Sequence, residues 1–136
     1  MADIRPFKAY RPVKELVSYV AAPPYDVVSS DEARELVKDN KYSFLRIDRG
    51  EINLPININQ YDDLVYQYSQ YLLDQMIDQG IFIQDEKPCF YIYREIMNGR
   101  SQTGLVLCAS VQEYVNNKIK KHENIRNDKA IDRIKH

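Results

Sequence analysis

The sequence predicts a mixed α/β fold, in which a small mixed sheet with a β-hairpin is covered by one long helix and one short helix. Three observations support this fold class. Residues 61–79 carry apolar side chains at helical spacing, several short segments are rich in aromatic and β-branched residues, and Asn98-Gly99 is a strong hairpin signal. A chain of 136 residues, 44% of them hydrophobic, can bury an apolar core, so we expect residues 1–136 to form a single domain.

The first 28 residues are predicted to be extended pieces joined by turns, because prolines interrupt them. Their apolar side chains are expected to join the core: Ile4, Phe7, Val17, Val20, Val27 and Val28. Ser29 and Glu32 then form a capping-box pattern, which predicts a short helix. The alternation of apolar and polar residues over 44–48 predicts a strand that turns at Arg49-Gly50.

The long helix is predicted over residues 61–79, with Asn59 as its cap and Gly80 just past its end. Strands are predicted at 81–83, 89–95 and 103–111. If Asn98-Gly99 is a two-residue turn, the numbers of opposed residues sum to 197. The opposed pairs are then Ile92–Leu105, Phe90–Leu107 and Cys89–Cys108.

The two cysteines are expected to be reduced and buried. Cys89 and Cys108 lie in apolar stretches and lack the Cys-x-x-Cys spacing of a zinc site. Disulfides are rare in a reducing compartment. No stretch approaches the roughly 18 apolar residues of a membrane span, and the N-terminus lacks the apolar run of a secretory signal. We therefore expect a cytoplasmic protein with no membrane partner.

The charge balance excludes no local site, but it gives no global reason for a nucleic-acid partner. There are 19 Lys plus Arg and 20 Asp plus Glu, so the net charge is -1. The eleven tyrosines do not interleave with a basic stripe as a base-stacking surface would. No Gly-rich phosphate loop is present, and nothing local supports Ser-His-Asp catalysis.

The last fifteen residues hold the clearest candidate site. On a helix, donor side chains recur at spacings of four and three and stack along one face: His122, Arg126, Lys129, Arg133 and His136. Guanidinium and ammonium groups in line suit a phosphate or a carboxylate. The alternative is a solvated helix face with Asp–Arg pairs, which periodicity alone favours.

Two further motifs could bring chemistry to a site. His122-Glu123 pairs an imidazole with a carboxylate, but Arg126 stands where a zinc helix needs its second His, so no metal is predicted. Two prolines fix the backbone ahead of Tyr25 and Asp26, which could present a phenol and a carboxylate. The commoner outcome is that Asp26 bonds nearby backbone in a turn.

Four separated motifs carry a family resemblance: IRPFKAYRP at 4–12, APPYDVV at 22–28, EAR at 32–34 with SFL at 43–45, and His122-Glu123 with Lys129 and Asp132-Arg133. Together they resemble the opening part of the bacterial and archaeal family catalogued as domain of unknown function 1015. Ile125 departs from the pattern, since members commonly have Thr there. The resemblance implies a longer architecture, of which this chain is the N-terminal portion. It also implies that the best candidate active site is a downstream Asp-Gly-His-His-Arg motif, similar to one in ParB-like and sulfiredoxin-like nucleotide-handling domains.

Two functions are expected. The first is the N-terminal part of a protein that binds a phosphorylated small molecule or a nucleotide, without turnover by this chain alone. Its candidate residues are Tyr25, Asp26, His122, Glu123, Arg126, Lys129, Asp132 and Arg133. The second is a non-catalytic interaction module that docks an acidic partner or the missing C-terminal segment. A homo-oligomer is compatible with both.

Overall fold

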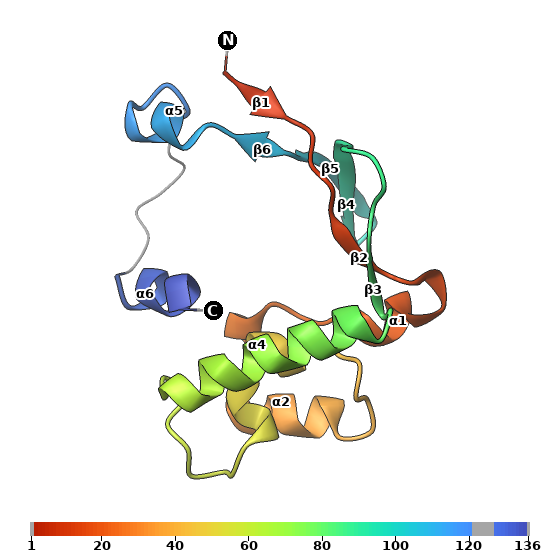
Figure 1. Cartoon of the computed structure of the whole chain (residues 1–136), viewed down its shortest axis with the longest axis vertical. Helices are drawn as coiled ribbons and strands as arrows, with labels where there is room; N and C mark the ends of the chain where they lie inside the picture. The colour runs from red at the N-terminus through yellow and green to blue at the C-terminus, as the bar shows by residue number, and fades with distance from the viewer. Residues whose placement is uncertain (1, 121–126, 136) are drawn as a thin grey trace. The chain divides into compact units, whose positions relative to one another are not determined.

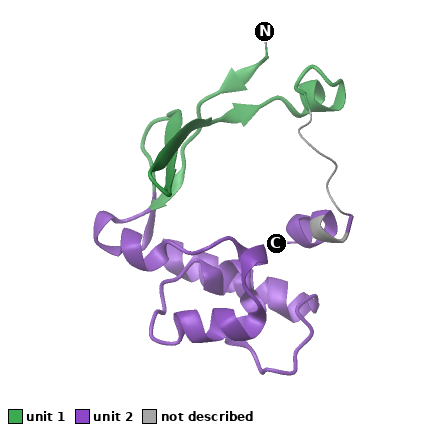
Figure 2. Ribbon diagram, turned by 180° about the vertical axis from the view of Figure 1, so that it is seen from behind, with its two compact units in different colours: residues 1–11, 84–124 green, residues 12–83, 125–136 purple. Residues whose placement is uncertain are grey.

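The computed structural model describes residues 2–120 and 127–135, with the side chains of all of these except Asp128 and Lys129. The chain contains both helices and short strands, which confirms the mixed α/β class (Figure 1). The chain forms two compact units (Figure 2). Unit 1 contains residues 1–11 and 84–124, and unit 2 contains residues 12–83 and 125–136.

Unit 2 is mainly helical. Its helices are η1 (Lys14–Leu16), α1 (Val17–Val20), η2 (Tyr25–Val27), α2 (Ser30–Val37), α3 (Leu45–Asp48), η3 (Gly50–Asn53), α4 (Asp63–Asp78) and α6 (Asn127–Lys135), where η marks a 3-10 helix. β2 (Tyr10–Pro12) pairs with β3 (Phe82–Gln84), and the boundary between the units falls within both strands.

The helix ends follow their local sequence. α2 begins at the predicted capping box, in which the Ser29 backbone N–H donates to the Glu32 carboxylate at 2.8 Å and the Glu32 N–H donates to Ser29 Oγ at 3.3 Å. The backbone hydrogen bond from Ser29 lowers the pKa of Glu32. α4 is capped by Asp62, whose Oδ1 accepts the Leu64 N–H at 2.9 Å, and Gly80 follows its end with a positive φ of 72°.

The strand predicted over residues 44–48 is wrong, because Leu45–Asp48 is α3, a single helical turn. The backbone closes this turn when the Phe44 carbonyl accepts the Asp48 N–H at 3.0 Å. Leu45 and Ile47 are both buried. Over only five residues, two apolar side chains separated by one polar residue fit a strand and a buried helical turn equally well.

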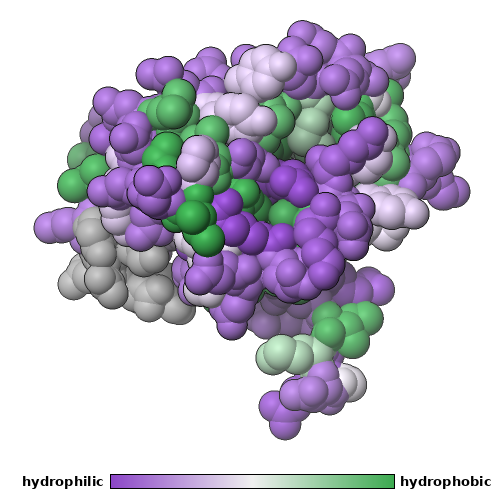
Figure 3. All heavy atoms as spheres, turned by 90° about the horizontal axis from the view of Figure 1, so that it is seen from below, coloured by the Kyte–Doolittle hydropathy of each residue, from purple (hydrophilic) through white to green (hydrophobic). Residues whose placement is uncertain are grey.

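All the buried apolar side chains in the described part of the chain belong to unit 2. One cluster contains Val20, Ile47, Met76, Ile81 and Phe82, and a second contains Ala33, Val37, Leu45 and Ile52. α4 packs against α3 and η3. Of the six N-terminal residues expected in the core, only Val20 is buried, whereas Ile4, Val17 and Val27 are exposed. Apolar side chains also reach the surface elsewhere on the molecule (Figure 3).

Unit 1 is built on extended segments: β1 (Ile4–Arg5), β4 (Tyr91–Met97), β5 (Arg100–Val106) and β6 (Cys108–Ala109), followed by α5 (Val111–Val115). The predicted hairpin register is confirmed, because Ile92 lies opposite Leu105. The turn residues Asn98 and Gly99 have φ of 51° and 76°, as a type I′ turn requires.

The predicted pairing of Cys89 with Cys108 is wrong. The β4–β5 ladder ends at Tyr91 opposite Val106. Beyond that point both chain segments pair with the N-terminal segment instead of with each other. Arg5 pairs with Cys108, and Phe7 forms a bridge with Cys89. Both thiols are free, as expected, but they are exposed rather than buried.

Polar contacts, rather than a core, fasten the N-terminal segment to the hairpin of unit 1. None of the unit's described residues is buried. The Tyr91 hydroxyl donates to Asp85 Oδ2 at 2.6 Å and accepts the Ala9 N–H at 2.9 Å. Arg11 holds the same carboxylate through Nη2 at 2.8 Å and Nε at 3.0 Å. The hydrogen bonds from Arg11 and then from Tyr91 lower the pKa of Asp85.

Candidate functional site

Two guanidinium groups organise a polar cluster in unit 2, which we call the arginine cluster. Its side chains come from η2, α2, the α3–η3 connection, α4 and α6. The members are Tyr25, Ser30, Asp48, Arg49, Glu51, Tyr66, Asp132 and Arg133. The cluster thus joins segments that are far apart in the sequence.

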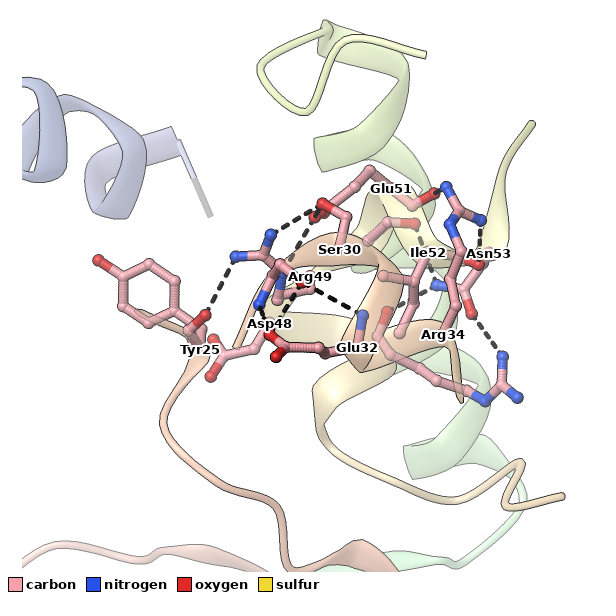
Figure 4. Close-up of polar contacts among 12 residues, drawn as sticks. Tyr25, Ser30, Glu32, Arg34, Asp48, Arg49, Glu51, Ile52 and Asn53 are labelled. Carbon is pink, nitrogen blue, oxygen red and sulfur yellow. Dashed lines mark hydrogen bonds and ion pairs between the residues drawn. The ribbon is translucent and has the colours of Figure 1, made fainter. Parts of the chain in front are cut away.

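Arg49 fixes three elements to one another (Figure 4). Its Nη1 donates to the Tyr25 backbone carbonyl at 3.0 Å, and its Nη2 donates to Ser30 Oγ at 2.8 Å. Glu51, only 5% exposed, is neutralised because its Oε1 lies 3.1 Å from Arg49 Nε and accepts the Ser30 hydroxyl at 2.9 Å. A buried carboxylate needs such a paired cation and hydrogen bonds. Arg49 therefore has a structural role.

Arg133 brings α6 into the cluster. Its Nη1 donates to Asp48 Oδ1 at 2.9 Å, and its Nη2 donates to Asp132 Oδ2 at 3.0 Å. Its Cζ lies 3.7 Å from the centroid of the Tyr25 ring, a cation–π distance. Burial alone would lower the pKa of Arg133, but the hydrogen bonds to Asp132 and Asp48 outweigh it and raise that pKa. The guanidinium is therefore charged and held on three sides.

Tyr66 positions the carboxylate that holds Arg133. Its hydroxyl, on α4, donates to Asp132 Oδ1 at 2.9 Å, and Asp132 is buried. Burial first, and then the hydrogen bond to Asp132, raise the pKa of Tyr66 to about 12. The phenol therefore stays protonated and remains a donor at neutral pH. Its interaction leaves the second oxygen of Asp132 for Arg133.

The cluster surrounds a small polar cavity of about 20 Å³. Its lining consists of Tyr25, Asp48, Arg49, Glu51, Gln60, Tyr61, Asp132 and Arg133. A space of this size holds about one water molecule or one ligand oxygen. Two arginines and three carboxylates line it, so the formal charge of the lining is 2 − 3 = −1. The cavity is polar and pre-organised but has no positive excess.

The structure brings three of the predicted site residues together: Tyr25, Asp132 and Arg133. Asp26 is exposed and does not line the cavity. His122, Glu123 and Arg126 lie outside the described residues, as does the side chain of Lys129. The basic stripe as a whole therefore stays a prediction, described only at Arg133.

Asp48, Arg49, Glu51 and Tyr66 were not predicted to belong to a site. The segment containing Asp48 and Arg49 was interpreted as a strand and its turn, and a turn explains charged residues without a site. The signal available was the density of opposite charges at Asp48, Arg49 and Glu51 within a short apolar region. Tyr66 gave no signal, because tyrosines at helical spacing are ordinary in a packed helix.

Neither a metal centre nor a membrane-spanning helix is evident in residues 2–120 and 127–135. These residues contain no group of three or more His, Cys, Asp or Glu side chains placed to hold a metal ion. They also contain no helix with the length and hydropathy to cross a membrane.

The comparison with known families gives one match. Residues 4–136 match the family described as Protein of unknown function (DUF1015). No curated protein and no solved structure matches the chain. Because the family match covers nearly the whole sequence, the chain belongs to the DUF1015 family.

Proposed function

We propose that this chain is the N-terminal part of a protein that binds a phosphorylated small molecule or a nucleotide, and that the arginine cluster of unit 2 contributes to the binding site. The observation that supports this most is the meeting of Tyr25, Asp48 and Arg133 from three separated segments. An aromatic face and a carboxylate hold the guanidinium in one orientation. Recognition of an oxyanion by the planar arginine group depends on such orientation.

Arg133 keeps one unused donor. Its Nε is buried and, like the Nε atoms of Arg34 and Arg49, has no hydrogen-bond acceptor among the described residues. Buried N–H groups are nearly always paired, so an unpaired one calls for an acceptor. The adjoining cavity has room for about one oxygen atom, from water or from a phosphate.

The charges of the cluster set the expected affinity. Because Asp48 and Asp132 already neutralise Arg133, an incoming anion competes with Asp48 for Nη1. Inorganic phosphate alone should therefore bind weakly. Removing the charge of Asp48 should strengthen the binding, because the lining would lose the carboxylate that repels the ligand.

Calorimetric titration with inorganic phosphate, pyrophosphate and ATP tests the proposal. Arg133→Ala should weaken binding by about 1.5–3 kcal/mol, the scale of a hydrogen bond to a charged group. Asp48→Asn should tighten it. Arg100→Ala, at an exposed position of the hairpin in unit 1, is the matched control and should leave affinity unchanged. Absence of binding by the natural sequence, or equal affinity for Arg133→Ala, would contradict the proposal.

A second candidate function is a non-catalytic interaction module that docks the downstream segment of the longer family architecture through α6. It is supported by the exposure of Ile131 and Ile134, at 58% and 83%, while Asp132 of the same helix is buried. In this case the contact is apolar, because the described basic groups of α6, Arg133 and Lys135, are already paired with carboxylates. A partner that covers these isoleucines would lower their exposure.

The two functions differ in what stabilises the chain. A ligand site predicts a higher melting temperature with pyrophosphate or ATP, whereas docking predicts a rise only with a purified downstream segment of a family protein. Ile131→Ser combined with Ile134→Ser should remove the second effect and leave the first. If neither addition changes the melting temperature, both proposals fail.

A further inference from the structure

We propose that the free edge of β5 pairs with the same edge of a second copy of this chain, so that two hairpins form one four-stranded antiparallel sheet. Among the described residues, β5 pairs with β4 alone, so its other side has no strand. All of its residues, Arg100–Val106, are exposed. An open strand edge presents a row of unpaired backbone N–H and C=O groups, which template the addition of another strand.

The ladder register identifies the outward-facing groups. Met97 and Arg100 flank the two-residue turn and form a hydrogen-bonded pair. Hydrogen-bonded and non-hydrogen-bonded pairs then alternate along the hairpin. The backbone groups of Ser101, Thr103 and Leu105 therefore point away from β4, toward the open edge.

This edge lacks the features that normally prevent pairing. Proteins protect strand edges with lysines, other charges, prolines or bulges. Apart from Arg100 at its start, β5 contains none of these residue types. Gly104 adds no side chain, and no atom lies within 4 Å of the position its Cβ would take. β4, in contrast, carries the charged pair Arg94 and Glu95. Of the two outer edges of the hairpin, that of β5 is therefore the less protected.

The edge of β5 is complementary to itself, which favours a second copy as the partner. In a symmetric antiparallel pair centred on Thr103, this residue opposes Thr103 of the second copy, and Ser101 opposes Leu105 of the second copy. The paired strands place no like charges directly opposite each other, because residues 101–106 are uncharged; the nearest charged group is Arg94 of β4, whose Nε donates to Thr103 Oγ1 at 3.4 Å. A Thr–Thr pair is favourable across strands. About six backbone hydrogen bonds would form, two for each hydrogen-bonded pair.

The dimer would also give the hairpin of unit 1 the additional strands that a stable sheet needs. A two-stranded hairpin is marginal in water, whereas three or more strands with an apolar face are stable. Ile92, Ile96 and Leu105 share one face of the hairpin and are 73%, 72% and 66% exposed. Joining two hairpins brings the apolar residues of both copies onto one face of a four-stranded sheet, which also carries Arg94, Ser101 and Thr103.

Sedimentation analysis over a wide range of protein concentration tests the dimer. The measured mass should rise from 16.0 kDa toward twice that value. Thr103→Pro removes an outward N–H while leaving the β4 ladder intact, and Thr103→Lys places two like charges at the symmetry axis. Each should raise the dissociation constant at least about tenfold. Thr103→Val, which keeps the β-branched shape, should not. A mass of 16.0 kDa at every concentration overturns the proposal.

Amide hydrogen exchange provides a readout specific to edge pairing. At high concentration the amides of Ser101, Thr103 and Leu105 should become protected, whereas those of Gln102 and Gly104, which face β4, should change little. Association without this alternation would show that another surface joins the copies, and would overturn the proposal. Neither measurement depends on the ligand site of unit 2, so the two proposals fail separately.

Discussion

Units 1 and 2 contain similar apolar residues but use them differently. Unit 2 buries Leu45 and Ile47 between its helices and fixes its loops with paired arginines. Unit 1 buries no described side chain, and polar contacts such as Arg11–Asp85 hold its N-terminal segment to its hairpin. The comparison shows that apolar content alone does not locate a core. It also separates the two proposed roles, ligand binding by the polar cluster of unit 2 and association through the strand edge of unit 1.

Truncation of a large apolar side chain should give the largest difference in stability loss between the two units. Leu45 is fully buried, so Leu45→Ala should lower the free energy of unfolding by about 2–5 kcal/mol through lost burial and a cavity. Leu105→Ala, the same change at an exposed site of unit 1, should alter it by less than about 0.5 kcal/mol. Urea unfolding at low protein concentration measures both. Equal losses would show that unit 1 has a core.

Adding a methyl group should give the next largest difference. A Cβ at Gly50 would lie 2.2 Å from Ser69 Oγ and 2.8 Å from the Val65 carbonyl oxygen, and the latter is helix backbone that cannot move aside. Gly50→Ala should therefore cost about 1–3 kcal/mol. Gly104→Ala in unit 1 meets no atom within 4 Å and should be neutral or slightly stabilising. A neutral Gly50→Ala in thermal unfolding would contradict the close packing of α4 on η3.

Loss of a single hydroxyl should have a smaller, local effect. Tyr66→Phe removes the hydrogen bond that the phenol donates to Asp132, the carboxylate that orients Arg133. We expect a loss of about 0.5–1.5 kcal/mol of stability. The Arg133 Nε–H signal in a nitrogen-correlated NMR spectrum should also move toward the position of a free arginine. Tyr71→Phe, on the same helix but exposed, is the control and should leave that signal in place.

Protonation of Asp85 at low pH should weaken the contacts within unit 1. Of the changes considered, it should have the smallest effect on the stability of the whole chain. The folded pKa of Asp85 is lowered by Arg11 and Tyr91, below the unfolded value of about 3.9. The contribution of ionised Asp85 to folding stability is therefore complete above the unfolded pKa and is lost as the pH falls through the folded pKa. NMR signals of Ala9 and Tyr91 should shift in that range. Asp85→Asn should remove the transition, and an unchanged transition would assign it to another group.

Local patterns in the sequence predicted those elements whose cause is local. The capping box of Ser29 and Glu32 starts α2, and the positive φ of Asn98 and Gly99 fixes the hairpin register. The helical turn of α3 was not predicted, because the apolar pattern of five residues is too short to distinguish a strand from a short helix. The pairing of Cys108 with β1 instead of with Cys89 was not predicted either, because β1 lies about a hundred residues away in the sequence.

The candidate site was predictable only in part for the same reason. Tyr25, Asp132 and Arg133 stood out in their own motifs, but their meeting depends on tertiary packing. Glu51 carried no signal of its own, because a charged residue in a turn is expected to be exposed. Its burial follows from Arg49, which lies two residues away and pairs with it.

Native-state hydrogen exchange at low protein concentration tests most directly the claim that, among the described residues, only those of unit 2 form an apolar core. We expect the amides of α4 to exchange only on global unfolding, and those of β4 and β5 to exchange at least about a hundredfold faster through local opening. Such a result would confirm that unit 2 is packed around a core and that the hairpin of unit 1 is less stable by itself. Equal protection of the hairpin and of α4 would contradict it.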